Sequence, residues 1–278
     1  MKKFSGILLC TDLDGTLLTE DKSISKQNIE AIEYFKSRGG LFSFITGRMP
    51  CFVADICTAV TPNCPFGCIN GGGIYDYQKR EYIWSVTLPD CVLELVECAY
   101  KNFPQTGIQI NTLDNIYSSN DNDAMERFRK RTNLKKNPCH YNNIQQPIAK
   151  VLFCDENEEN INRLIHLLSS HPLAESFGFI RSEKTLYEIL PKGISKGTAL
   201  LKLAEHLGVD MNKTIAVGDY DNDVEMLLAA KVGVAVANAS PAAKRAADFV
   251  TVSNTEHAIA VVIDAIDKGS LLAHAQSL

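Results

Sequence analysis

FSGILLCTDLDGTLL, residues Phe4–Leu18, joins a short apolar run to two closely spaced carboxylates. Gly6–Cys10 is continuously apolar, as is typical of a strand buried on both faces of a parallel sheet. Asp12 and Asp14 follow one residue apart, where that strand should end. Like charges this close repel each other, and burying either one without a partner is costly. The pair therefore indicates a bound cation at the end of a central strand.

The segments after this stretch alternate between helix and strand. Ser25–Arg38 is expected to be helical because Ile29, Ile32 and Phe35 share one face, and Gly39–Gly40 ends it. Further strands are expected at Leu41–Thr46 and Phe66–Asn70, with a helix between them at Pro50–Val60. Strand–helix–strand repetition implies parallel strands joined by right-handed crossovers.

The pattern changes after residue 71. GGGIYDYQKREYIWSV predicts a hairpin in which Ile74–Tyr77 and Tyr82–Val86 flank the polar residues QKRE. Helices are then expected at Pro89–Asn102, Asp121–Arg131 and Glu156–Ser170. Strands are expected at Ile108–Asn111, Asn115–Ser118, Ala149–Cys154 and Leu186–Leu190. This mixture indicates an α+β insert with antiparallel strands.

The strand–helix alternation returns at Ser195. Helices are expected at Ser195–Leu207, Asp221–Ala230, Pro241–Ala247 and Glu256–Lys268, and strands at Thr214–Gly218, Gly233–Val236 and Phe249–Val252. The simplest organisation is one α/β domain built from residues 1–80 and 192–278, with a second domain inserted at 81–191. The linkers would lie near Lys79–Tyr82 and Pro191–Gly193.

Composition excludes several classes of protein. The chain has 278 residues, of which 45% are hydrophobic and 22% charged, and these fractions are typical of a globular protein. A net charge of −5 and the lack of a basic stripe argue against a nucleic-acid partner. The N-terminal apolar run is too short for a signal peptide, and no run approaches the ~18 residues of a membrane span. Nine scattered cysteines indicate reduced thiols. We therefore expect a soluble, cytoplasmic protein that binds no membrane.

Polar clusters follow four of the expected strands, and a lysine opens the helix after the insert. Ligands bind at the carboxyl ends of the strands in open parallel sheets, so these clusters should converge on one edge. The clusters are Asp12 with Asp14, Thr46–Arg48, Asn70–Gly72 and Gly218–Asp223, and Lys196 opens the helix after the insert.

These clusters, in this order, resemble the haloacid dehalogenase (HAD) superfamily of phosphotransferases. More narrowly, they resemble its Cof-type phosphatases, which carry an α/β (C2B-type) cap. TDLDGTLL fits the DxDGTL motif, ITGR carries the motif Thr, ISKGTAL supplies the Lys, and VGDYDND fits the GDxxND motif. INGG, EILPKGISKG and VANA are similar to secondary Cof-type signatures. The resemblance covers nearly the whole chain. It implies an α/β fold: a Rossmann-like HAD core with a parallel central sheet, plus an inserted α+β cap that selects substrates.

The resemblance also implies a catalytic set. Asp12 would be the nucleophile that forms an aspartyl phosphate, and Asp14 would be the general acid and base. Both can reach one phosphoryl group, because residues two apart in an extended segment point the same way. Thr46 and Lys196 would hydrogen-bond the phosphoryl oxygens.

Magnesium is the cofactor that the resemblance implies. The family pattern puts Mg²⁺ on Asp12, the backbone carbonyl of Asp14, and Asp219. Asp223 would bind the metal through water or hold a neighbouring ligand. Oxygen ligands of this kind suit Mg²⁺.

Four further residues are expected to bind substrate, namely Gly15, Gly47, Arg48 and Asn222. Gly15 allows a close backbone approach, and the backbone N–H groups near it can bind phosphate. Arg48 could instead pair with a surface carboxylate, and Asn222 could only order the acidic loop.

Each motif also has a purely structural explanation. Asp12 and Asp14 could form an Asp-Gly turn, and Asp219, Asp221 and Asp223 could cap the helix that follows them. Thr46 could be a strand-end hydroxyl, Lys196 a solvated helix residue, and Asn70 only the residue before a glycine turn. The four motifs together favour the enzyme.

The sequence therefore predicts a Mg²⁺-dependent phosphatase that acts on small phosphorylated metabolites, with sugar phosphates as the expected class. Polar candidates for substrate selection in the insert are Asp114, Arg181, Lys184, Tyr187 and Glu188. One alternative is a sugar phosphomutase of the same fold, in which a second hydroxyl receives the phosphoryl group. Another is a non-catalytic protein that binds a phosphorylated metabolite.

Overall fold

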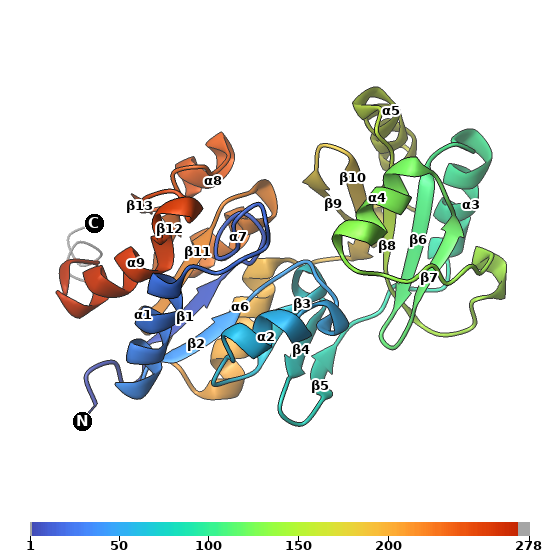
Figure 1. Cartoon of the computed structure of the whole chain (residues 1–278). Helices are drawn as coiled ribbons and strands as arrows, with labels where there is room; N and C mark the ends of the chain where they lie inside the picture. The colour runs from blue at the N-terminus through green and yellow to red at the C-terminus, as the bar shows by residue number, and fades with distance from the viewer. Residues whose placement is uncertain (1, 272–278) are drawn as a thin grey trace. The chain divides into compact units, whose positions relative to one another are not determined.

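The computed structural model describes residues 2–271 of the chain, which forms two compact units (Figure 1). The first unit joins the residues up to Ser85 with those from Ser195 onward. The second unit is the continuous stretch Val86–Ile194. Within residues 2–271, no helix combines the length and hydropathy needed to cross a bilayer.

The first unit is built on a parallel five-stranded sheet of order β13-β12-β11-β1-β2. Its strands are β1 (Leu8–Thr11), β2 (Leu41–Phe44), β11 (Thr214–Gly218), β12 (Val232–Ala235) and β13 (Phe249–Val250). Every residue of β1 is buried, and Cys10 pairs with Ser43 of β2 and Ala216 of β11. The predicted α/β class with a parallel central sheet is confirmed.

Six helices accompany this sheet among the residues that the structure describes. They are α1 (Lys26–Ser37), α2 (Ala54–Ala59), α6 (Lys196–Leu207), α7 (Val224–Ala229), α8 (Pro241–Ala246) and α9 (Ala258–Asp267). Figure 1 shows α1 beside α9, and the Asn28 side chain of α1 accepts a hydrogen bond from the backbone of Ala260 in α9. Ser25 caps the start of α1 by accepting from the backbone N–H of Asn28.

An antiparallel sheet of β3 (Phe66–Cys68), β4 (Gly73–Asp76) and β5 (Glu81–Ser85) completes the first unit. The predicted hairpin is confirmed as β4 and β5, which pair antiparallel. This pairing keeps residues 81–85 in the first unit, so the division falls after Ser85 and not after residue 80.

Several expected boundaries in the first unit are wrong, among them the ends of the strands expected at Leu41–Thr46 and Phe249–Val252, which stop at Phe44 and Val250. The strand expected at Phe66–Asn70 ends at Cys68, because Ile69 and Asn70 take positive φ values and join a 3₁₀ turn at Ile69–Gly71. The helix expected at Pro50–Val60 is broken into a 3₁₀ turn, Pro50–Phe52, and α2. The helix expected from Asp221 likewise starts as a 3₁₀ turn, Asp221–Asp223, before α7.

The second unit has an antiparallel sheet of order β7-β6-β8-β10-β9. Its elements are α3 (Val92–Asn102), β6 (Gly107–Thr112), β7 (Ile116–Asn120), α4 (Asp123–Arg131), β8 (Ile148–Cys154), α5 (Glu158–Ser169), β9 (Phe177–Glu183) and β10 (Leu186–Pro191). The expected antiparallel α+β arrangement is confirmed. The sequence pattern did not predict β9, an edge strand with one buried residue, Phe177.

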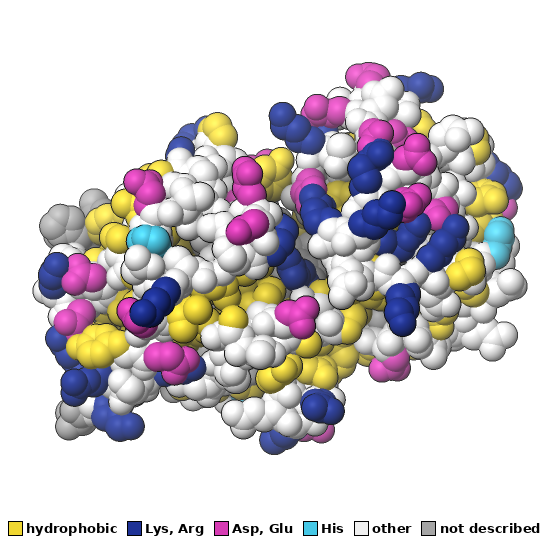
Figure 2. Space-filling view, in the orientation of Figure 1, with side chains coloured by type: hydrophobic (Ala, Val, Ile, Leu, Met, Phe, Trp, Pro, Cys, Tyr) yellow, Lys and Arg dark blue, Asp and Glu magenta, His cyan; other side chains and the backbone are white. Residues whose placement is uncertain are grey.

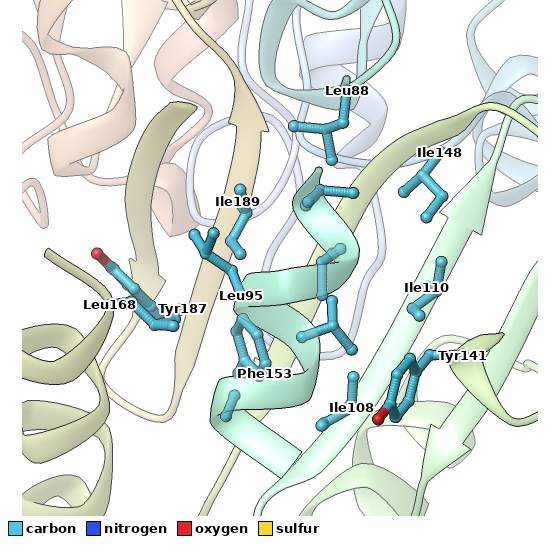
Figure 3. Packing of buried hydrophobic residues seen from close by; sticks show 14 of the residues in the cluster. Leu88, Leu95, Ile108, Ile110, Tyr141, Ile148, Phe153, Leu168, Tyr187 and Ile189 are labelled. Carbon is cyan, nitrogen blue, oxygen red and sulfur yellow. The ribbon is translucent and has the colours of Figure 1, made fainter. Parts of the chain in front are cut away.

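Helices pack against both faces of this sheet. On one face, α3 and α5 cover a cluster that includes Leu95, Phe153 and Ile189 (Figure 3). On the other, α4 covers a smaller cluster that includes Met125 and Leu152. Leu152 and Phe153 are adjacent in β8 and point to opposite faces, as successive strand residues do.

Candidate active site

A buried lysine brings three distant parts of the first unit together. Lys196 is the first residue of α6, and its Nζ lies 2.6 Å from Asp12 Oδ1 and 2.6 Å from Asp223 Oδ1. Its side chain is only 1% exposed. Burial alone would lower the pKa of this amine, but the charges of Asp12 and Asp223 outweigh it and raise the pKa above the usual range. Lys196 therefore remains a buried cation.

The local sequence fixes where α6 begins. Ser195 and Thr198 form a capping box, so the first turn of the helix has its hydrogen bonds satisfied. Gly71, at φ +101°, lies against this turn, and a Cβ there would be 1.9 Å from the Ser195 carbonyl oxygen. The glycine turn thus lets the start of α6, and with it Lys196, approach the end of β3.

Asp12, Asp219 and Asp223 form a carboxylate cluster in which one oxygen from each lies within 4.8 Å of the others. Burial raises the pKa of Asp12 well above its usual range. The charge of Lys196 acts to lower this pKa, and the charges of Asp223 and Asp219 act to raise it. Burial and the charge of Asp223 raise the pKa of Asp219 to about 6. Crowded, buried carboxylates of this kind favour either a shared proton or a cation.

The donor set fits a divalent cation. Three ionised carboxylates and the Lys196 ammonium leave two negative charges, which one divalent ion would balance. Oxygen atoms are also the ligands that Mg²⁺ prefers. The geometry therefore supports a metal held beside Asp12.

Both carboxylate oxygens of Asp223 are engaged. Oδ1 pairs with Lys196, and Oδ2 accepts hydrogen bonds from the backbone N–H groups of Asp219 (2.9 Å) and Tyr220 (3.0 Å). Asp219 is further oriented by Thr16, whose hydroxyl donates to Asp219 Oδ1 at 2.7 Å. Asp223 therefore holds the backbone of Asp219 and Tyr220 in place.

Asp14 has a different environment from Asp12. Arg48 donates to it through two nitrogens, at 2.7 Å to each carboxylate oxygen, and Lys22 Nζ lies 2.7 Å from Oδ1. Burial acts to raise the pKa of Asp14, but the hydrogen bonds and charges of Arg48 and Lys22 prevail and hold it well below the usual range. One carboxylate with two cations leaves net positive charge, which suits a phosphate group.

Gly15 lies between the two carboxylate environments. Its φ is +88°, and a Cβ there would come within 2.4 Å of Asp219 Oδ2. Its carbonyl oxygen accepts a hydrogen bond from Asn238 Nδ2 at 2.8 Å. Glycine is therefore required here both by the backbone conformation and by the space left for Asp219.

The loop after β2 is tied to its neighbours. The Thr46 hydroxyl accepts from the backbone N–H of Arg48 at 3.2 Å, and Thr46 is buried. A Cβ on Gly47 would lie 2.8 Å from Asn70 Oδ1, which also accepts from Asn222 Nδ2 at 3.0 Å. Asn70 thus supports this loop, and Asn222 helps to order it.

The structure brings together ten residues that the sequence analysis singled out for the site, all in the first unit: Asp12, Asp14, Gly15, Thr46, Gly47, Arg48, Lys196, Asp219, Asn222 and Asp223. It adds Thr16, Lys22 and Asn238, to which no role was given beforehand. Thr16 lies in TDLDGTLL and Asn238 lies in VANA, so both stood within motifs that the sequence offered. Nothing in the sequence pattern distinguishes Lys22 from other surface lysines.

The candidates in the insert lie in the second unit and have varied environments. Tyr187 stacks on Phe179 and belongs to the hydrophobic core, and Arg181 pairs with Glu158 at 2.9 Å. Glu188 is buried and pairs with Lys150 at 2.8 Å.

Comparisons with known proteins agree with this geometry. Residues 9–263 match the profile of a family described as haloacid dehalogenase-like hydrolase. The chain is 30% identical over 290 residues to YwtE of Bacillus subtilis (strain 168), named a 5-amino-6-(5-phospho-D-ribitylamino)uracil phosphatase; the match covers 94% of this chain and 98% of YwtE. YitU of the same strain has the same activity in its name and is 27% identical over 259 residues, covering 91% of this chain and 94% of YitU.

A solved structure is similar throughout. The crystal structure of a haloacid dehalogenase-like hydrolase from Bacteroides thetaiotaomicron superposes with a TM-score of 0.83 at 28% identity. The superposition covers 94% of this chain and 99% of that protein, so both the sheet of the first unit and that of the second have counterparts there.

Proposed function

Because the chain belongs to the haloacid dehalogenase-like hydrolases and is a phosphatase, we propose that it hydrolyses small phosphate monoesters through an aspartyl phosphate on Asp12, with Mg²⁺ as its metal ion. The observation that carries this proposal is the position of Asp12, which contacts the buried Lys196 and shares a carboxylate cluster with Asp219 and Asp223. A protein that only bound its ligand would gain little from a nucleophile held in this way.

Asp12, Asp219 and the backbone carbonyl of Asp14 are the groups proposed to hold Mg²⁺, with Asp223 orienting the acidic loop. Two uncompensated negative charges in the cluster support this assignment. When bound, the metal would reduce the charge repulsion between the phosphoryl group and the Asp12 carboxylate.

The first chemical step is assigned to Asp12 and Asp14. An Asp12 carboxylate oxygen forms a bond to phosphorus, the bond from phosphorus to the ester oxygen breaks, and Asp14 gives that oxygen a proton. In the second step, water attacks phosphorus and gives a proton to Asp14, and the bond from phosphorus to the Asp12 oxygen breaks. This regenerates the Asp12 carboxylate and releases inorganic phosphate.

Asp14 must be protonated for the first step, yet its pairing with Arg48 and Lys22 holds its pKa low. Phosphoryl oxygens would compete with Asp14 for these two cations. Loss of the pairs on substrate binding would raise the pKa of Asp14 toward the range that an acid needs. Thr46 and Lys196 are proposed to hydrogen-bond the same phosphoryl oxygens.

The proposed substrates carry their phosphate on a hydroxylated carbon chain. The resemblance favours sugar phosphates, and the names of YwtE and YitU specify a phosphorylated ribityl group. Both are phosphate esters of a hydroxylated chain. We propose the second unit, residues 86–194, as the part of the chain that selects among them.

The test measures free phosphate released from sugar phosphates, a ribityl phosphate, pyridoxal phosphate and 4-nitrophenyl phosphate. It compares Mg²⁺ with EDTA, and the wild type with Asp12→Asn. We expect release that requires Mg²⁺ and falls by several orders of magnitude in Asp12→Asn. The matched control is Asp264→Asn, an exposed carboxylate of α9, which should retain full activity.

Each part of the proposal can fail separately. Full turnover in EDTA would overturn the metal requirement, and full turnover by Asp12→Asn would overturn the aspartyl phosphate. Transfer of phosphate to a second hydroxyl without release would identify a mutase instead.

A further inference from the structure

A row of polar side chains crosses the sheet of the second unit on the face that α4 partly covers. Asn111 of β6 is paired with Lys150 of β8, and Glu188 of β10 is paired with Leu152, a member of the α4 cluster. Ser182 of β9 and Gln109 of β6 extend the row at its two ends. Figure 2 shows acidic and basic side chains intermixed on the α4 side of this unit.

This polar row is buried. Gln109 is 2% exposed, Asn111 1%, Lys150 6% and Glu188 3%. Lys150 Nζ lies 2.8 Å from Glu188 Oε2, the Ser182 hydroxyl donates to Glu188 Oε1 at 2.6 Å, and Gln109 Nε2 donates to Asn111 Oδ1 at 2.9 Å. Burying polar groups across three adjacent strands, β6, β8 and β10, is costly, and apolar side chains would pack there more favourably.

Two amide atoms in the row have no hydrogen-bond partner among residues 2–271. They are Gln109 Oε1, an acceptor, and Asn111 Nδ2, a donor. Exchanging O and N in both amides still leaves one donor and one acceptor, so this inventory does not depend on how the amides are oriented. Buried polar atoms in native proteins nearly always have a partner, which indicates that something outside the protein chain supplies it.

The chemistry of the row selects the class of ligand. An anion would meet the Glu188 carboxylate and could give no hydrogen to Gln109. A cation would meet the Lys150 ammonium, and an apolar group would leave both amide atoms unsatisfied. A hydroxyl group both donates and accepts, so neighbouring hydroxyls satisfy the two amides together.

We propose that Gln109 and Asn111, flanked by the Lys150–Glu188 pair, form a binding site for an uncharged, polyhydroxylated group. The proposal rests on the proposed function for one of two sources of this group, namely the hydroxylated part of the phosphate ester. The other source is a free polyol that binds the second unit.

The test uses the full chain and two near-isosteric variants, Asn111→Leu and Gln109→Met, singly and combined. Each single variant also strands the other amide, because Gln109 Nε2 donates to Asn111 Oδ1, and should therefore melt below the wild type. The combined variant removes both unsatisfied atoms and the bond between them, so without ligand it should melt at the same temperature as the wild type or higher. The matched control is Asn137→Leu, at an exposed asparagine next to β7 whose amide donates to Ile116.

Two measurements distinguish the sources. Steady-state KM is measured for ribitol 5-phosphate and for 4-nitrophenyl phosphate, which has no hydroxyl groups. Saturation-transfer NMR measures the binding of free ribitol. If the row binds the ester, the combined variant should raise KM for ribitol 5-phosphate at least tenfold and leave that for 4-nitrophenyl phosphate unchanged. If it binds a free polyol, the ribitol signal should disappear while both KM values stay constant.

Two results would overturn the proposal. In the first, the combined variant matches the wild type in both KM values and in the ribitol signal, which would mean that bound water satisfies the amides. In the second, both KM values change by the same factor, which would mean that the row contributes to folding and does not contact the hydroxyl groups. A wild type that releases no phosphate would sink the proposed function, while ribitol binding would still test this site.

Discussion

At the scale of single residues, the charge of Asp12 depends on neighbours with opposing effects. Burial and the carboxylates of Asp219 and Asp223 favour its protonated form, whereas Lys196 at 2.6 Å favours the ionised form. A nucleophile must be deprotonated, so a cation bound in the cluster would reinforce the effect of Lys196. Asp14, only two residues away, contacts two cations and is ionised without further help.

We expect the affinity for Mg²⁺ to rise as the pH is raised through about 6. The raised pKa of Asp219, about 6, means that a proton occupies this carboxyl group at lower pH and must leave before the metal binds. Raising the pH removes that proton and the competition. One pH unit below the pKa the affinity should be about tenfold weaker than at neutral pH. Calorimetric titration at pH 5 and pH 7.5 measures this, and equal affinities would contradict it.

Gly15→Ala should abolish metal binding. Its Cβ would lie 2.4 Å from Asp219 Oδ2, so the carboxylate must move. The matched control is Gly269→Ala, because Gly269 also has positive φ, +73°, but a Cβ there meets nothing within 4 Å. Both variants should lose about 1–2 kcal/mol of stability from backbone strain. Only the control should still be stabilised by Mg²⁺ in thermal denaturation, and equal Mg²⁺ stabilisation of both would refute the argument.

The sequence predicted the residues whose chemistry is written into short motifs, such as Asp12 and Lys196. It gave no role to Thr16 and Asn238, although both lie in the motifs TDLDGTLL and VANA, because their partners are distant in the sequence. Thr16 reaches Asp219 across 203 positions, and Asn238 reaches Gly15 across 223. No periodicity or local spacing encodes such contacts, since they exist only once the sheet has assembled.

At the scale of elements, the Ile69–Gly71 turn and the start of α6 together position Lys196. The turn places Ile69 and Asn70 at positive φ, which asparagine adopts more readily than a β-branched residue, and Gly71 leaves room for the Ser195 carbonyl. The apolar pattern extended the expected strand through Asn70, because that pattern carries no information about the sign of the backbone angle φ. The break between Pro50–Phe52 and α2, where φ stays negative, was also not visible in the apolar pattern.

Gly71→Ala should therefore impair catalysis through α6. A Cβ 1.9 Å from a backbone oxygen cannot be accommodated without shifting the helix start, which carries Lys196 away from Asp12. The matched control lies at the other end of the same helix: Gly208→Ala has φ +64° and open space around its Cβ. We expect at least a tenfold lower kcat for Gly71→Ala and an unchanged kcat for Gly208→Ala. If the two variants gave the same kcat, the turn would not position Lys196.

At the scale of the whole molecule, the two units differ in how the chain builds them. The second unit is one continuous stretch with its own hydrophobic cluster, whereas the first needs strands from both ends of the chain. Alternating strands and helices made the α/β class predictable. The division after Ser85 was not, because it depends on the pairing of β4 with β5 and not on composition.

Residues 86–194, expressed alone, should fold. Their sheet and both of its helix layers are complete within that range. Residues 1–85 alone should not, because β1 would lose β11 on one side. Circular dichroism with thermal melting checks both fragments. A cooperative transition is expected for residues 86–194 and not for residues 1–85. If residues 86–194 showed none, the second unit would depend on the rest of the chain.

The pairing of β1 with β11 also bears on how the protein is made. The ribosome releases β1 about 200 residues before its partner strand exists. At roughly 5–20 residues per second, the apolar stretch LLCT waits on the order of 10 to 40 s beside the exit tunnel, while residues 86–194 emerge and can fold. The nascent chain therefore carries β1 with one edge unpaired through most of its synthesis, because β2 can cover only the other edge. This makes the first unit the natural client of ribosome-associated chaperones.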